Sequence, residues 1–237
     1  MSDHPASSTL RRLAVSYNST RCWTIICLGL VYVCVAHQND GQKQENVKLE
    51  TPLGAISVTY FGPRKTHVDA IAIHGMAFAM KDEWVGVAEY LATTQNVRIA
   101  VPDFHSNPAT NPRALSNGFA QVCHSIAPSS KVIMLGKSWG GASVARFAAS
   151  HPQSVKAAVL VAPALPSAEI ATTCATWPGP TLLLWARDDP VVPYARASAW
   201  QNQCRHVTLH TTDTGGHTIV TEDYKKPIVD FVRGGLK

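Results

Sequence analysis

The feature that most constrains this chain is a serine held between an apolar run and a run of small residues. Residues 131–135 read Lys-Val-Ile-Met-Leu, residues 136–141 read Gly-Lys-Ser-Trp-Gly-Gly, and residues 142–149 read Ala-Ser-Val-Ala-Arg-Phe-Ala-Ala. This order predicts a buried strand, a tight turn with Ser138 at its apex, and a helix. Glycines two before and two after the serine permit a sharp turn that leaves its hydroxyl exposed. Ser138 is therefore the candidate nucleophile.

A nucleophilic serine needs a histidine to take its proton and a carboxylate to orient that histidine. Residues 181–185 predict a buried strand, and the loop that follows carries Asp188 and Asp189. Residues 206–210 alternate like a strand and lead into a Gly-rich loop that ends at His217. Each candidate follows a different strand at its carboxyl end, where open α/β sheets build their sites.

From about residue 47 to the C-terminus, the chain resembles the α/β-hydrolase superfamily. The resemblance rests on His-Gly at 74–75, the turn at Ser138, Val-Pro at 192–193, and Gly-His at 216–217. The order serine, acid, histidine is also that of this superfamily. The resemblance implies His217 as the general base.

The superfamily's acid loop usually reads G-x-x-D-x-x-V-P. Laid onto this chain, the motif places its aspartate at Asp189 and its glycine at Ala186, which is a mild departure. Asp188 stays open as the alternative acid. The resemblance also implies an oxyanion hole formed by the backbone N–H groups of Met76 and Trp139. The side chain of His74 is expected to order the loop rather than to take part in the chemistry.

The rest of the chain alternates between strand and helix patterns, which predicts an α/β class fold. We expect the α/β-hydrolase fold, a mostly parallel central sheet with helices on both faces. Expected strands are 47–51, 55–60, 68–74, 97–102, 131–135, 157–161, 181–185 and 206–210; expected helices are 83–93, 113–126, 140–151, 194–203 and 223–232. The first two strands should pair antiparallel, because only three residues separate them.

The segment 162–180, where many hydrolases insert a cap, is short and contains four prolines. It leaves room for one short helix near 167–173, so no cap domain is expected. An open site of this kind favours small or accessible substrates over long buried lipid chains.

The N-terminus is a separate element. Residues 23–36 carry no charged side chain and follow Arg11, Arg12 and Arg21, which is typical of a signal peptide or signal anchor. We expect a leader at 1–36, a polar linker at 37–46 and the α/β-hydrolase domain at 47–237. The protein would then enter the secretory pathway or associate with a membrane through residues 22–36. The alternatives are a cytoplasmic protein with an unusual leader and an organelle presequence.

Charge and cysteine usage bound the partners and cofactors. The formal charge of +5 is spread along the chain and gives no nucleic-acid footprint. No C-x-x-C or paired-ligand spacing predicts a metal site, and no cofactor is expected. In the domain, a Cys174–Cys204 bridge and free buried thiols are equally open. Lys137, beside the serine, is expected to point away from the pocket.

Together these features predict a serine hydrolase that cleaves carboxylic ester, thioester or amide bonds through an acyl-enzyme. Its partner would be a small-molecule acyl substrate, and carboxylesterases are the nearest class. Two alternatives share the fold. One is a ligand receptor or interaction protein with negligible turnover, and the other is an acyltransferase that uses the same acyl-enzyme.

Overall fold

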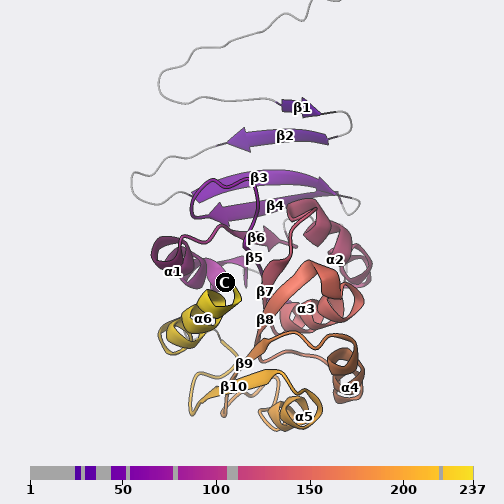
Figure 1. Ribbon diagram of the computed structural model, residues 1–237, viewed down its shortest axis with the longest axis vertical. Helices are drawn as coiled ribbons and strands as arrows, with labels where there is room; N and C mark the ends of the chain where they lie inside the picture. Colours follow the sequence, from indigo (N-terminus) through magenta and orange to yellow (C-terminus); the bar gives the residue numbers. More distant parts are fainter. Residues whose placement is uncertain are drawn as a thin grey trace, which may run out of the picture.

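A single ten-stranded sheet runs through the protein, in the order β1-β2-β3-β4-β6-β5-β7-β8-β9-β10, with helices on both faces (Figure 1). The structure is a computed structural model that describes residues 25–27, 30–35, 44–51, 54–76, 80–105, 112–218 and 221–236. The strands are β1 Ile25–Cys27, β2 Leu30–Val35, β3 Gln44–Thr51, β4 Gly54–Phe61, β5 Ala70–Ile73, β6 Ile99–Asp103, β7 Val132–Lys137, β8 Val155–Val161, β9 Thr181–Ala186 and β10 Val207–Thr212. The helices are α1 Val85–Gln95, α2 Pro112–Ile126, α3 Trp139–Ser150, α4 Ser167–Thr176, α5 Arg196–Gln203 and α6 Thr221–Gly235, with 3-10 turns η1 Met80–Trp84 and η2 Pro152–Ser154.

The six strands from β6 to β10 in the sheet are parallel, whereas β1 to β4 are joined by antiparallel pairings. The chain passes from β5 to β6 on one side and then returns to place β7 on the other side of β5. Open α/β sheets bind ligands at the carboxyl ends of strands where the order reverses in this way. Ile73 pairs with Gly136 across β5 and β7, so the loops after these two strands start side by side.

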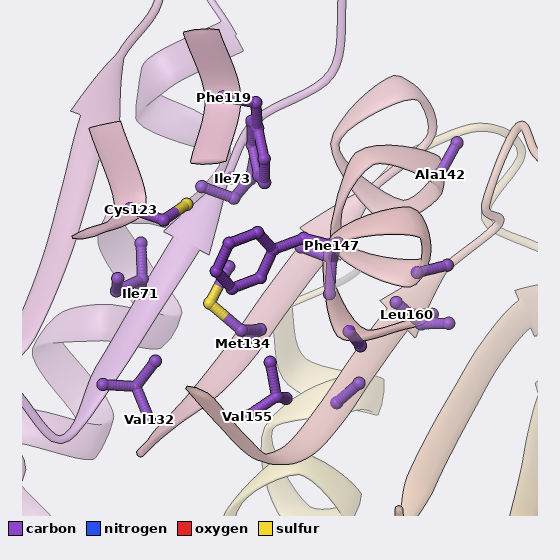
Figure 2. Close-up of a cluster of buried hydrophobic side chains, with 14 of the residues drawn as sticks. Ile71, Ile73, Phe119, Cys123, Val132, Met134, Ala142, Phe147, Val155 and Leu160 are labelled. Atoms are coloured by element: carbon purple, nitrogen blue, oxygen red, sulfur yellow. The ribbon is translucent and has the colours of Figure 1, made fainter. Parts of the chain in front are cut away.

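The central strands β5 and β7 carry continuous apolar runs, at residues 70–73 and 132–135, because helices bury both of their faces. Ile71 and Ile73 pack with Val132 and Met134 under α2 and α3, around the ring of Phe147 (Figure 2). The residues between them face the other side, under α1 and α6: Ala70, Ala72, Ile133 and Leu135. A strand buried on both faces reads as a continuous apolar run, which is why the sequence predicted these strands well.

The mostly parallel sheet with helices on both faces is confirmed, and every expected strand and helix is present with its ends moved by a few residues. β3 begins at Gln44, ahead of the expected start at 47. Its first residues are polar, but Thr59 Oγ1 donates to Asn46 Oδ1 at 2.7 Å and Arg98 pairs with Glu45 at 3.1 Å. These polar contacts extend β3 toward the N-terminus, beyond residue 47, where hydrophobic patterning alone starts the strand.

β1 and β2 were not expected as strands. β2 pairs antiparallel with β3, from Val33 opposite Lys48 to Val35 opposite Asn46. The run they belong to is apolar and rich in β-branched residues, a composition that periodicity alone does not assign to one kind of element. Among the described residues, no helix has both the length and the apolar character needed to cross a bilayer.

The connection between β8 and β9 is described in full and contains no cap domain, only α4. α4 lies beside α3 and α5 in the layer on one face of the sheet (Figure 1). Arg146 of α3 holds Glu169 of α4 through two hydrogen bonds of 2.8 and 3.0 Å, and a disulfide joins Cys174 to Cys204 after α5. The remaining domain cysteine, Cys123, is buried and free, and burial raises its pKa.

Candidate active site

Ser138 occupies a strained turn between β7 and α3. Its backbone has φ 52° and ψ −115°, a combination that costs free energy for any residue with a side chain. Neighbouring strands hold it there, because the Ser138 N–H donates to the carbonyl of Val161 at 2.9 Å. Its carbonyl accepts from the N–H groups of Ala142 and Ala164 at 3.0 and 2.9 Å. Strain that the surrounding structure holds in place is found mainly at functional sites. The turn leaves Ser138 partly exposed at the carboxyl end of β7.

Close packing explains why glycines flank the serine. A Cβ at Gly136 would lie 2.5 Å from the carbonyl oxygen of Gly140, and one at Gly141 would lie 3.0 Å from Pro163. A Cβ at Gly140 would overlap the carbonyl oxygen of Ile73 at the end of β5. The small residues therefore do more than permit the turn. They also let the start of α3 approach the loop after β5.

Asp189 and His217 form a hydrogen-bonded pair. The Asp189 side chain is fully buried, and its Oδ2 lies 2.8 Å from Nδ1 of His217, whose side chain is 14% exposed. The other oxygen of Asp189 accepts from the N–H groups of Val191 and Val192 at 2.8 and 2.9 Å. Because a carboxylate accepts hydrogen bonds, this contact places the imidazole proton of His217 on Nδ1. Nε2 is then the nitrogen that can act as a base.

Asp188, the alternative acid, contacts the same loop through its backbone instead. Its Oδ1 accepts from the N–H of Gly216 at 2.8 Å and its Oδ2 accepts from the N–H of Gly215 at 3.3 Å. Both glycines have positive φ, 134° at Gly215 and 58° at Gly216, which L side chains rarely adopt. The two consecutive aspartates therefore hold the His217 loop at different points, and it is Asp189 that hydrogen-bonds the imidazole.

The other two histidines of this region lie elsewhere. His210, on β10, packs edge-on against Tyr224 of α6 with ring centroids 6.3 Å apart. His206 precedes β10 and lines a hollow with Cys174 and Arg205 at the amino ends of β9 and β10. Ser138, Asp189 and His217 instead follow the carboxyl ends of β7, β9 and β10, within four adjacent strands of the sheet.

The loop after β5 is ordered by the imidazole of His74, which is fully buried. The N–H of Phe104 donates to Nε2 of His74 at 3.0 Å, so the proton lies on Nδ1, which donates to the carbonyl of Gly75 at 2.5 Å. Burial lowers the pKa of His74 and favours this neutral form. The Gly75 carbonyl turns toward the ring, so the trans peptide turns the N–H of Met76 in the opposite direction.

Two residues of this site were missed from the sequence. Lys137, fully buried, contacts the carboxylate of Glu83 in η1, and Glu83 Oε2 accepts the N–H of Gly75 at 3.3 Å. Beside it, the indole N–H of Trp84 donates to the carbonyl of Ile73 at 2.9 Å. Glu83 and Trp84 belong to a short 3-10 turn with no catalytic motif, so only the folded chain reveals them.

No group of three or more histidine, cysteine, aspartate or glutamate side chains is placed to hold a metal ion within the described part of the chain. The loops at the carboxyl ends of β5, β7, β9 and β10 carry a hydroxyl, an imidazole–carboxylate pair and two backbone N–H groups. This set suits nucleophilic acyl transfer.

Comparison with known proteins agrees with this geometry. A family model described as serine aminopeptidase, S33, matches residues 110–177, which span the turn at Ser138. No functionally curated protein shows significant sequence similarity to the chain. Solved structures resemble it at low identity but over most of their length.

Three of them show the extent of the likeness. Protein lip1 of Acinetobacter baumannii AYE is 16% identical with a TM-score of 0.68, covering 83% of this chain and 92% of its own. Est1E from Butyrivibrio proteoclasticus is 17% identical with a TM-score of 0.65, covering 86% of this chain and 98% of its own. Naproxen esterase (carboxylesterase NP) of Bacillus subtilis is 13% identical with a TM-score of 0.65, covering 83% and 93%.

Sheet order, helix layers and these structural matches all agree on one fold. The chain has the α/β-hydrolase fold, and the resemblance stated from the sequence is confirmed at the level of the fold.

Proposed function

We propose that the protein is a serine hydrolase that cleaves carboxylic ester, thioester or amide bonds, with carboxylesters as the main class. The observation that carries the proposal is the strained Ser138, which lies at the carboxyl ends of the parallel strands, as does the Asp189–His217 pair. Backbone strain costs free energy, so it persists mainly at residues that have a function. A buried carboxylate that orients an imidazole is the arrangement that a general base requires. The esterases among the structural neighbours support the carboxylester class by analogy.

The reaction would run through an acyl-enzyme. Oγ of Ser138 attacks the carbonyl carbon while its proton passes to Nε2 of His217, and the ionised Asp189 stabilises the imidazolium that forms. When the tetrahedral intermediate collapses, His217 returns the proton to the leaving alcohol, thiol or amine. Water then attacks the acyl-serine with His217 again as base, which releases the acid and restores the enzyme.

The negative charge on the carbonyl oxygen would be stabilised by the backbone N–H groups of Met76 and Trp139. Trp139 begins α3, so its N–H is one of the unpaired donors at a helix N-terminus. Met76 follows the peptide that His74 orients from the neighbouring strand. Removing one such donor typically raises the barrier by about 3 kcal/mol.

We further propose that the substrates are small or accessible, because α4 lies against α3 and α5 rather than forming a cap. Residues 1–36 are proposed to target the protein to the secretory pathway or a membrane. The Cys174–Cys204 disulfide supports this, because such bonds persist mainly in oxidising compartments.

A fluorophosphonate probe tests the function directly, because it phosphonylates only an activated serine. Wild-type protein should be labelled at Ser138, and Ser138→Ala should abolish labelling. Ser150→Ala, at the exposed end of the same helix, is the matched control and should label like the wild type. A folded wild-type protein that takes no label would contradict the hydrolase and favour the non-catalytic alternative.

A further inference from the structure

Lys137 is a charged residue placed where an apolar one would suffice. It ends β7 immediately before Ser138, and its side chain is 1% exposed. Its Nζ pairs with the carboxylate of Glu83 in η1, whose side chain is 14% exposed. Burying an ion pair costs so much desolvation that well-packed apolar side chains are often as stabilising. The pair therefore calls for an explanation other than stability.

The second oxygen of Glu83 supplies that explanation. It accepts the N–H of Gly75, at 3.3 Å, while the first oxygen contacts Nζ of Lys137. Gly75 directly precedes Met76, the proposed oxyanion donor. One carboxylate therefore connects the residue before the nucleophile to the residue before the oxyanion donor.

Neighbouring contacts make this connection specific. Trp84, the next residue in η1, is fully buried and donates to the carbonyl of Ile73 at 2.9 Å. The turn thus holds the loop after β5 on both sides of His74. His74 turns the Gly75 carbonyl toward its ring, and Glu83 holds the N–H at the other end of the same residue. The backbone around the proposed donor is fixed from two directions.

We propose that Lys137 and Glu83 form a positioning pair that sets the oxyanion loop relative to Ser138. This role rests on the proposed serine hydrolase function and deepens it. Lys137 holds the carboxylate of Glu83 in place, and Glu83 holds Gly75 so that the N–H of Met76 faces the developing oxyanion. Neither side chain touches the substrate. Without Lys137, the Glu83 carboxylate would lose the cation that holds it and would turn away, and the loop would lose its anchor.

The test compares Glu83→Gln, Lys137→Met and the double variant Glu83→Leu/Lys137→Met with the wild type. Arg146→Met is the matched control, because it removes a largely exposed ion pair with Glu169 from the helix that follows Ser138. The readouts are melting temperature, kcat and KM for p-nitrophenyl butyrate, and the affinity of a trifluoromethyl ketone that forms an oxyanion on the serine.

We expect the single variants to lose melting temperature and the apolar double variant to regain most of it. In the double variant and in Glu83→Gln, kcat should fall about tenfold to a hundredfold with KM within about twofold, because loop placement acts in the transition state. Affinity for the ketone should fall in parallel. Arg146→Met should keep wild-type values in all three measurements.

A double variant with wild-type kcat would overturn the proposal, since the pair would then be only structural. So would a Glu83→Gln variant that loses stability but keeps its kcat and ketone affinity. Wild-type turnover is measured first, and its absence would contradict the proposed function itself. The two failures are thereby distinguished.

Discussion

Asp188 and Asp189 are consecutive in the chain, yet their carboxylates hold the loop of His217 at different points. Asp189 binds the imidazole from a buried position, whereas exposed Asp188 accepts the N–H groups of Gly215 and Gly216. The imidazole is therefore oriented by one acid and its loop backbone by the other. This division suggests that Asp188 contributes to rate without taking part in proton transfer.

Asp188→Asn should lower kcat about threefold to tenfold, because an amide oxygen can replace only part of the two backbone contacts and the base would be placed less well. Asp213→Asn is the control. It removes the same charge from the same loop, but Asp213 is 92% exposed and pairs only with Arg187 in the described structure. Steady-state kinetics on both variants checks this expectation. Equal losses in the two would point to charge, not to the loop contacts.

His217→Ala should lower kcat by about 10⁴-fold or more, because members of a catalytic triad act as a unit. His210→Ala is the matched variant on the preceding strand, where the ring packs against Tyr224. It should change kcat little while lowering stability slightly. Hydrolysis of p-nitrophenyl acetate by the purified variants gives both values. A mild His217→Ala beside a damaging His210→Ala would refute the assignment of the base.

His74 predicts an acid-side loss of stability. Its pKa in the folded protein is lowered by burial from an ordinary value of 6.5, so the unfolded chain takes up this proton at higher pH than the folded one. The stabilisation from neutral His74 is present above pH 6.5 and is lost as the pH falls below it. The melting temperature of the wild type should therefore be lower at pH 5.5 than at pH 7.5. His74→Asn, less stable at pH 7.5, should show a flatter profile, and an equally steep one would exclude this cause.

Removing residues 1–36 should leave a soluble protein with specific activity within about twofold of the full chain, because the strands that bear the site stay paired. In the sheet β2 lies between β1 and β3, so the loss of β1 and β2 makes β3 the new edge strand. Circular dichroism and esterase activity of the truncated protein check this. Loss of folding would show that β1 and β2 belong to the domain.

How much could be predicted from the sequence depended on whether a residue acts through a local pattern. Ser138 sits in a strand–turn–helix pattern that neighbouring residues define, and the burial of β7 on both faces makes its residues 132–135 an unbroken apolar run. The choice between Asp188 and Asp189 needed the fold, because both precede the same turn and only long-range contact separates them. Glu83 could not be predicted for the same reason, since 54 positions separate it from Lys137.

The strands in the apolar leader were missed because an apolar run without alternation fits a strand, a buried helix or a membrane segment equally.

The last prediction concerns the length of the acyl chain. The connection between β8 and β9 contributes only α4, which packs in the helix layer, so it gives distal acyl carbons no cover. Each buried CH₂ is worth about 0.8 kcal/mol, so an enclosed acyl pocket would raise kcat/KM about fourfold per carbon along a p-nitrophenyl ester series. An open site should instead reach its highest kcat/KM between acetate and butyrate and then level off or decline. The series from acetate to laurate, measured below the solubility limit of each ester, distinguishes the two cases. A steady rise to laurate would refute the open site and imply that residues outside the described structure, or a bound membrane, enclose the chain.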